Sequence, residues 1–349
     1  MNDPESAYLT PEGKARLAID EMLAAAGWAV QDANRVNLSA SRGVAVREFV
    51  LKPPHGKVDY LLFVDGAAVG VIEAKKKGDT LTGVEVQSTK YVEGLPDEIP
   101  SALEGPLPFA YESTGTETRF TNVLDPDARS REVFYFYRPE TFADWIAEVH
   151  NHPLEPTLRH RLRALPPLDA TDLWLAQERA IQNLEKSLSE NRPRALIQMA
   201  TGAGKTFTAA NIAYRLVRFA DAHRVLFLVD RANLGRQTLA EFQKFAVPSD
   251  GRKFSDLYNI QRLSSQHIDP VARVTISTVQ RLYSVLRGDV EFDEELDEHS
   301  ADSVAPSEPV PVVYNPKVPI ETFTWSWSMS ATARSTASGA RCSTTSMPS

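Results

Sequence analysis

Residues 200–206 constrain the fold of this chain more than any other segment. They read Ala-Thr-Gly-Ala-Gly-Lys-Thr, between an apolar run at 194–199 and a stretch of helical periodicity at 205–219. A glycine-rich turn between a buried strand and a helix lets backbone N–H groups approach phosphate oxygens, and the helix dipole favours the negative charge. The pattern therefore predicts a phosphate-binding loop on an α/β sheet.

Two side chains of this loop have predicted roles of their own. Lys205 would reach the β- and γ-phosphates of a bound nucleotide, and the hydroxyl of Thr206 would bind Mg²⁺. The standard pattern has glycine where Met199 stands, so the match is to a looser form of the loop. A chance glycine-rich turn is the alternative, which the flanking strand and helix disfavour. The predicted nucleotide-binding residues are Gln177, Thr201, Gly202, Ala203, Gly204, Lys205 and Thr206.

Gln177 precedes the loop on a predicted helix. A glutamine at this distance often reads adenine in helicase motors, but a solvated helix glutamine is the simpler interpretation of the residue alone. Polar residues also follow the predicted strands at 224–230 and 272–277, at the sheet edge where ligands bind in open α/β folds. At each strand end, contact with a nucleic-acid backbone and simple loop capping remain equal alternatives.

The chain from residue 172 onward alternates between helical and strand patterns. This alternation predicts a parallel sheet with helices on both faces. The expected helices are 174–190, 205–219, 232–246 and 278–286, and the expected strands are 194–199, 224–230 and 272–277.

A second cluster of candidate site residues lies in a β-rich region at 44–75. Glu73 and Lys75 are two apart on one predicted strand and so share a face. The turn signal Asp65-Gly66 predicts a hairpin that brings Asp59, on the preceding strand, beside them. The sequence therefore predicts a site with two carboxylates and one lysine.

This cluster suits metal-dependent hydrolysis of a phosphodiester. Asp59 and Glu73 supply oxygen ligands of the kind Mg²⁺ prefers, and a bound Mg²⁺ lowers the pKa of a coordinated water. Lys75 would orient that water and offset developing negative charge. Gln87 and Tyr91, on one face of a predicted helix at 83–94, complete the catalytic prediction.

The simpler interpretation of this cluster is a solvated ion pair, because Glu-x-Lys is a common triplet. The position of the triplet argues against it, since Glu73 and Lys75 end an apolar strand. Charges placed there are costly unless they are paired or used.

Composition limits the disulfide content, cellular location and mode of nucleic-acid binding that we expect. The chain has one cysteine, Cys342, among 349 residues, so no internal disulfide forms. We expect a cytoplasmic protein, because the sequence shows neither a signal peptide nor an apolar run long enough to span a membrane. The net charge of −8 disfavours a generally basic nucleic-acid coat but permits a local basic groove.

Over roughly residues 10–323 the chain resembles the endonuclease (R) subunit of type I restriction enzymes. The segments that carry the resemblance are 58–60, 70–75, Gln87 with Tyr91, 138–141, 199–206, 227–234, 314–316 and 319–323. The resemblance implies a motor of two RecA-like domains that translocates double-stranded DNA with ATP and Mg²⁺. It also implies an Asp–Glu-x-Lys nuclease that cleaves unmethylated DNA, in complex with modification and specificity subunits.

The predicted fold class is α/β, with two domains. We expect a restriction-endonuclease-like nuclease domain at 1–152, a linker at 153–170, and an incomplete first RecA-like lobe at 171–323. The alternatives are a non-catalytic remnant that docks DNA or another subunit, and a helicase–nuclease of another defence or repair system. Neighbouring genes for modification and specificity subunits would favour the endonuclease subunit of a type I restriction enzyme over both alternatives.

Residues 324–349 depart from the family pattern and are expected to be a disordered tail. They hold thirteen serines and threonines and no acidic residue, where the family has an acidic ATPase box. A coding string for residues 324–335 that gains one guanine at its start reads Asp-Val-Val-Val-Val-Asp-Glu-Cys-His-Arg-Ser-Ile. We therefore expect that one lost base shifted the reading frame here, which leaves a truncated motor.

Resequencing the gene around codon 324 checks this expectation. An additional base there would restore the buried strand and the acidic box. A genomic sequence whose codons yield no acidic box in any frame would show that the tail is not a shifted reading of one.

Overall fold

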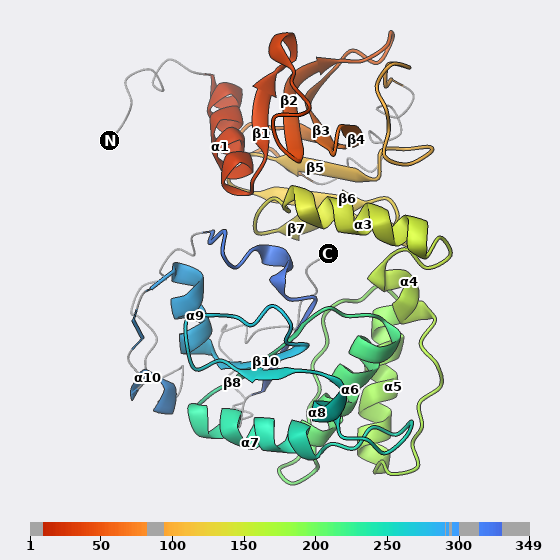
Figure 1. The fold of residues 1–349 in the computed structure, drawn as a ribbon, viewed down its shortest axis with the longest axis vertical. Helices are drawn as coiled ribbons and strands as arrows, with labels where there is room; N and C mark the ends of the chain where they lie inside the picture. The colour runs from red at the N-terminus through yellow and green to blue at the C-terminus, as the bar shows by residue number, and fades with distance from the viewer. Residues whose placement is uncertain (1–9, 82–93, 290, 293–294, 300–313, 330–349) are drawn as a thin grey trace. The chain divides into compact units, whose positions relative to one another are not determined.

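The computed structural model describes residues 10–81, 94–289, 291–292, 295–299 and 314–329. The chain divides into two compact units (Figure 1). Of the described residues, the first unit comprises those up to Thr157 together with Pro319–Glu321, and the second comprises those between Leu158 and Val318 and those from Thr322 to Met329. Among the described residues, no helix combines the length and apolar character that a membrane span requires.

The first unit is built on a mixed sheet of seven strands in sequential order. Its strands are β1 (Ala29–Asp32), β2 (Gly43–Val50), β3 (Lys57–Val64), β4 (Ala67–Ala74), β5 (Phe109–Ser113), β6 (Thr118–Asn122) and β7 (Arg131–Val133). The central strand β4 pairs antiparallel with β3 and parallel with β5. The strands and the hairpin predicted around Asp65-Gly66 are confirmed.

Two helices pack on one face of this sheet, α1 (Pro11–Ala25) and α3 (Pro139–Asn151) (Figure 1). Alternate residues of a strand point to the same face, which supplies the apolar surface that these helices cover. At the centre, the fully buried ring of Phe142 lies 4.5 Å from that of Phe109 and 5.6 Å from that of Trp28. The short turn η2 (Ala33–Arg35) follows β1.

The second unit contains a parallel sheet in the order β11-β8-β10-β9. Its strands are β8 (Val225–Val229), β9 (Ile260–Arg262), β10 (Val274–Thr278) and β11 (Trp325–Met329). Its helices among the described residues are α4 (Leu158–Arg163), α5 (Leu175–Ser189), α6 (Lys205–Phe219), α7 (Ala232–Lys244), α8 (Phe254–Leu257), α9 (Val279–Arg287) and α10 (Glu295–Glu298), with the turn η4 (Ile320–Thr322) before β11. Helices α7 and α9 lie on opposite sides of the strands, which confirms the predicted parallel sheet with both faces covered (Figure 1).

The strand predicted before the phosphate loop is absent. Residues 192–200 form no helix or strand, and Leu196 is 94% exposed. Ala195 and Ile197 still pack against the core of the unit, so the segment is extended but joins no ladder. A strand inside a parallel sheet needs a partner on each side, and β11 is the edge of the sheet among the described residues.

The disordered tail predicted from residue 324 must also be corrected. Trp325–Met329 form β11, which pairs in parallel with β8 from Trp325 opposite Val225 to Met329 opposite Val229. The indole of Trp325 is 1% exposed, and the ring of Trp327 stacks on Phe227 at 6.3 Å. One buried tryptophan and a second, half-buried one that packs against the core explain why this serine-rich run still joins the sheet. The remainder of the predicted tail, 330–349, lies outside the described residues.

The predicted linker at 153–170 is shorter than expected. Residues from Leu158 onward belong to the second unit, where α4 buries Leu162 at 2% exposure and contacts α5. The proline-rich composition suggested a linker, but the short helix between the prolines carries apolar side chains that the core takes up.

Candidate functional site

Asp59 lies near the start of β3, beside the end of β4. Its Oδ2 accepts a hydrogen bond of 2.8 Å from the N–H of Ala74, and its side chain is 17% exposed. The antiparallel pairing of β3 with β4, from Tyr60 opposite Ile72, sets this position. The hairpin therefore brings Asp59 to the strand end that carries Glu73 and Lys75.

Glu73 and Lys75 share one side of the chain at the end of β4. The Nζ of Lys75 lies 3.4 Å from Oε2 of Glu73, and the backbone N–H of Lys75 donates to Ser113 at 2.8 Å. The second bond pairs the backbone of Lys75 with β5, so the hydrogen bonding of β4 with β5 extends one residue beyond the end of β4. Of the other residues predicted for this site, Gln87 and Tyr91 lie outside the described part of the chain.

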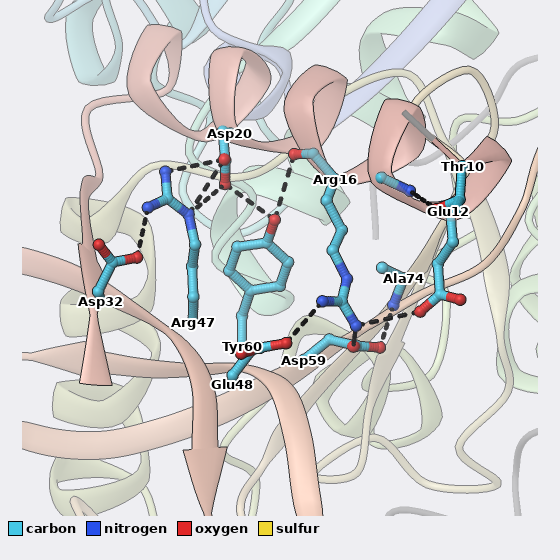
Figure 2. Close-up of polar contacts among 11 residues, drawn as sticks. Thr10, Glu12, Arg16, Asp20, Asp32, Arg47, Glu48, Asp59, Tyr60 and Ala74 are labelled. Atoms are coloured by element: carbon cyan, nitrogen blue, oxygen red, sulfur yellow. Dashed lines mark hydrogen bonds and ion pairs between the residues drawn. The ribbon is translucent and has the colours of Figure 1, made fainter. Parts of the chain in front are cut away.

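Arg16 on α1 is a charged neighbour of this cluster that no sequence motif indicates. Its guanidinium contacts Oδ1 of Asp59 at 2.5 Å and Oε1 of Glu48 at 2.9 Å (Figure 2). Burial lowers the pKa of Arg16, but Asp59 and the neighbouring glutamates outweigh burial, so its net pKa is raised. Arg16 therefore remains charged and neutralises Asp59.

A second set of ion pairs lies beside Arg16. Arg47 bonds to Asp20 at 3.0 Å and to Asp32 at 2.8 Å, and the Tyr60 hydroxyl donates to Asp20 at 2.8 Å (Figure 2). A cavity of about 420 Å³ between these groups is lined by Arg16, Arg47, Lys57 and Asp59, among others. Because both arginines are already paired with carboxylates, this cavity has no evident excess of positive charge.

Glu112 on β5 is a further buried carboxylate near the cluster. It pairs in register with Glu73 on the parallel strand β4, so both side chains leave the same side of the sheet. It is 6% exposed, and neither carboxylate oxygen has a hydrogen-bond partner among the described residues. No sequence motif marks this residue, because only the strand pairing brings it to Glu73.

The donor set matches the chemistry of Mg²⁺ only in part. Asp59 and Glu73 offer carboxylate oxygens, the ligand type that Mg²⁺ prefers. Among the described residues, however, no group of three or more His, Cys, Asp or Glu side chains is placed to hold a metal ion. Oδ1 of Asp59 is also shared with Arg16. These residues fit a metal that keeps several water ligands and is held by two carboxylates.

Two glycines of the predicted phosphate loop have left-handed backbone conformations. Gly202 and Gly204 have φ values of 82° and 76°, in the left-handed region that glycine tolerates, and α6 begins at Lys205. The Nζ of Lys205 donates to the carbonyl of Ala200 at 3.0 Å. The hydroxyl of Thr206 lies 3.9 Å from Sδ of Met329, at the end of β11.

Gln177 is not a solvated helix residue. It is 5% exposed, and its Nε2 donates to the carbonyl of Ala203 at 3.1 Å. Its Oε1 accepts from the N–H of Trp174 at 3.0 Å, which closes the first turn of α5. Gln177 therefore joins α5 directly to the phosphate loop.

At the end of β10, Thr278 acts as a helix cap, which is one of the two alternatives predicted for this strand end. Its hydroxyl accepts from the N–H of Arg281 at 3.2 Å and so caps α9. It also donates to Asp297, which pairs with Arg281 at 2.7 Å.

The burial of Glu112 leads to a testable dependence of stability on pH. Burial raises the pKa of Glu112 from 4.5 to about 7, while Lys75 and Arg119 act in the opposite direction. The folded protein therefore binds the Glu112 proton more tightly than the unfolded chain does. Its free energy of unfolding should fall as the pH rises from 4.5 to about 7. Glu112→Gln should reduce that fall by on the order of 1 kcal/mol once solvent screening is allowed for.

Chemical denaturation of the metal-free protein at pH 5 and pH 8 measures this difference. The exposed Glu117→Gln is the matched control and should follow the wild-type protein. Equal pH dependence in wild type and Glu112→Gln would show that Glu112 does not contribute.

Comparison with known families gives two matches. Residues 171–304 match the family described as type III restriction enzyme, res subunit. Residues 24–112 match the family described as type I restriction enzyme EcoKI endonuclease subunit second domain. The two matches fall on different parts of the chain.

Individual relatives carry similar names. The chain is 27% identical over 322 residues to the type I restriction enzyme EcoKI endonuclease subunit of Escherichia coli strain K12, with 78% of this chain and 27% of that protein covered. It is 24% identical over 249 residues to the SauMSSORF170P endonuclease subunit of Staphylococcus aureus strain MSSA476, with 68% and 26% covered. The chain thus spans about a quarter of the length of these relatives.

A solved structure was also matched, a fragment described as an HsdR subunit of a type I restriction enzyme from Vibrio vulnificus YJ016. It is 17% identical with a TM-score of 0.30, and 80% of this chain and 49% of that chain are covered. The sequence relatives confirm the resemblance found in the motifs. The chain is homologous to the endonuclease subunits of type I restriction enzymes, with a helicase-like region of restriction-enzyme type at residues 171–304.

Proposed function

We propose that the first unit is a Mg²⁺-dependent nuclease domain of a type I restriction system, which cleaves double-stranded DNA that lacks protective methylation. The observation that carries the proposal is the meeting of Asp59, Glu73 and Lys75 at adjoining ends of β3 and β4. Asp59 and Glu73 would hold the metal ion. When bound, Mg²⁺ supplies a water of lowered pKa and a polarised phosphodiester.

The protein groups have distinct tasks in this proposal. Ala74 fixes Asp59 through its backbone N–H, so one carboxylate oxygen is oriented before any ligand arrives. Lys75, 3.4 Å from Glu73, is close enough to orient the attacking water and to offset charge on the phosphate. Arg16 neutralises Asp59 and would have to share or release Oδ1 for a metal ion. Gln87 and Tyr91 remain proposed catalytic residues.

For the second unit we propose binding of ATP at the loop around Lys205, with Gln177 and residues 201–206 as the contacts and Thr206 as the Mg²⁺ ligand. The left-handed glycines and the helix that begins at Lys205 support it. By homology, the intact subunit would translocate DNA with ATP. It would act in the cytoplasm, off the membrane, with modification and specificity subunits.

A non-catalytic docking fragment is the second candidate. The ion pair between Arg16 and Asp59 favours it, because this pair occupies one oxygen of a predicted metal ligand. Cleavage measurements with site variants separate the two candidates.

We expect Mg²⁺-dependent cleavage of plasmid DNA by the full chain, lost by at least about a hundredfold in Glu73→Ala and in Lys75→Ala. The first variant removes a metal ligand and the second removes the charge that orients water. Gel electrophoresis of supercoiled plasmid at several Mg²⁺ concentrations measures the rate.

Lys77→Ala is the matched control, because Lys77 is exposed two residues beyond Lys75. It should cleave like the wild-type protein. Cleavage that survives in Glu73→Ala would contradict the nuclease assignment, whereas no cleavage by any form would favour the docking fragment.

We expect the chain to hydrolyse no ATP above the background of Lys205→Ala. The side chain that meets Thr206 at the end of β11 is Met329, a thioether. ATP hydrolysis needs carboxylates that hold Mg²⁺ and the attacking water, and methionine supplies neither. Phosphate release with and without DNA measures the rate, and ATP-dependent strand movement by the purified chain would contradict the expectation.

A further inference from the structure

Glu112 is held beside the proposed nuclease residues by backbone pairing. Its register partner on β4 is Glu73, and neighbouring strands lie about 4.8 Å apart. The next residue on β5, Ser113, accepts the backbone N–H of Lys75 at 2.8 Å. Glu112 is therefore fixed beside Glu73, and it directly precedes Ser113, the residue that binds the backbone of Lys75.

A buried carboxylate without a partner is costly, so the missing partner of Glu112 needs an explanation. Two cations are close enough to affect it, Lys75 and Arg119. Arg119 already donates to Ser130, through Nε at 3.0 Å to the hydroxyl and through Nη2 at 2.8 Å to the carbonyl. Among the described residues, the Lys75 ammonium has one side-chain contact, a long one of 3.4 Å to Glu73, so Lys75 can change partner more easily than Arg119.

Binding of a divalent cation by Glu73 would weaken that contact. A cation bound to Glu73 would offset the negative charge that attracts the Lys75 ammonium group, and its positive charge would repel that group. Arg16 does not compete with Lys75 for another carboxylate, because Arg16 is already paired with Asp59 and Glu48. Glu112, the register partner of Glu73, then offers a buried carboxylate whose acceptor positions are unused among the described residues.

We propose that Glu112 is a positioning residue that accepts the Lys75 ammonium when Glu73 binds a divalent cation. The inference rests on the proposed nuclease function, because it assigns the metal to Glu73. Glu112 then keeps Lys75 in the site without acting as a metal ligand itself. A charge-assisted hydrogen bond of this kind restricts a flexible side chain that would otherwise move into solvent.

Chemical labelling of Lys75 tests the proposal without measuring activity. The full-length protein is treated with acetic anhydride, with and without Ca²⁺, and acetylation of Lys75 is followed by mass spectrometry. Lys75 is 31% exposed, so the reagent reaches it, and the exposed neighbours Lys76 and Lys77 serve as internal standards. Ca²⁺ stands in as a divalent cation with oxygen ligands.

Without Ca²⁺, Glu112→Gln should label like the wild type, because Glu73 holds Lys75. With Ca²⁺, Lys75 should be acetylated roughly tenfold faster in Glu112→Gln than in wild type. Glu112→Asp should partly restore protection, and the exposed Glu117→Gln should change nothing. Equal labelling of wild type and Glu112→Gln in Ca²⁺ would overturn the proposal.

Calorimetric titration with Ca²⁺ separates the remaining outcomes. Glu112→Gln should bind Ca²⁺ with wild-type affinity, whereas a severalfold loss would make Glu112 a metal ligand and overturn the positioning role. Ca²⁺ binding that is unchanged in Glu73→Gln would instead overturn the metal assignment in the proposed function, and the present inference with it. In cleavage assays, Glu112→Gln should lower kcat with little change in KM for DNA.

Discussion

The pairing of β4 with a different neighbour on each side is the constraint on which the proposed nuclease site depends. Antiparallel pairing with β3 sets Asp59 beside Ala74, and parallel pairing with β5 sets Glu112 opposite Glu73. Gly70 permits the close approach of β5, since a Cβ there would lie 2.3 Å from the carbonyl oxygen of Phe109. Backbone hydrogen bonds, rather than contacts among the charged side chains, therefore hold the charged groups together.

The second unit lacks a comparable constraint at its proposed phosphate loop. The glycine conformations and the start of α6 are local properties of the segment, and they form without a strand before it. Residues 192–200 lie outside the ladder, and no described strand pairs with β11 on the side away from β8. A strand buried on both faces usually reads as a continuous apolar run, and the Trp-Ser-Trp-Ser-Met sequence of β11 does not.

The sequence predicted the features that depend on local patterns. Helices such as α5 and α6 and the hairpin of β3 with β4 follow from periodicity and turn residues, and Asp59, Glu73 and Lys75 follow from that hairpin. Glu112 and Arg16 could not be predicted, because β5 is more than thirty residues from β4 and α1 reaches Asp59 only through tertiary packing. The prediction for 324–329 was wrong because it rested on composition, whereas Trp325 is buried in the core and Trp327 packs against it.

The position of β11 bears on the predicted shift of the reading frame. A restored frame replaces Trp325–Met329 with four valines and an aspartate, and that aspartate falls at position 329. In the structure, Met329 ends β11 opposite Val229, with its sulfur 3.9 Å from the hydroxyl of Thr206. A carboxylate at this strand end would therefore face the proposed Mg²⁺ ligand. The backbone register is consistent with a site whose acidic residue has been replaced, because a strand forms here despite a sequence poorly suited to a parallel sheet.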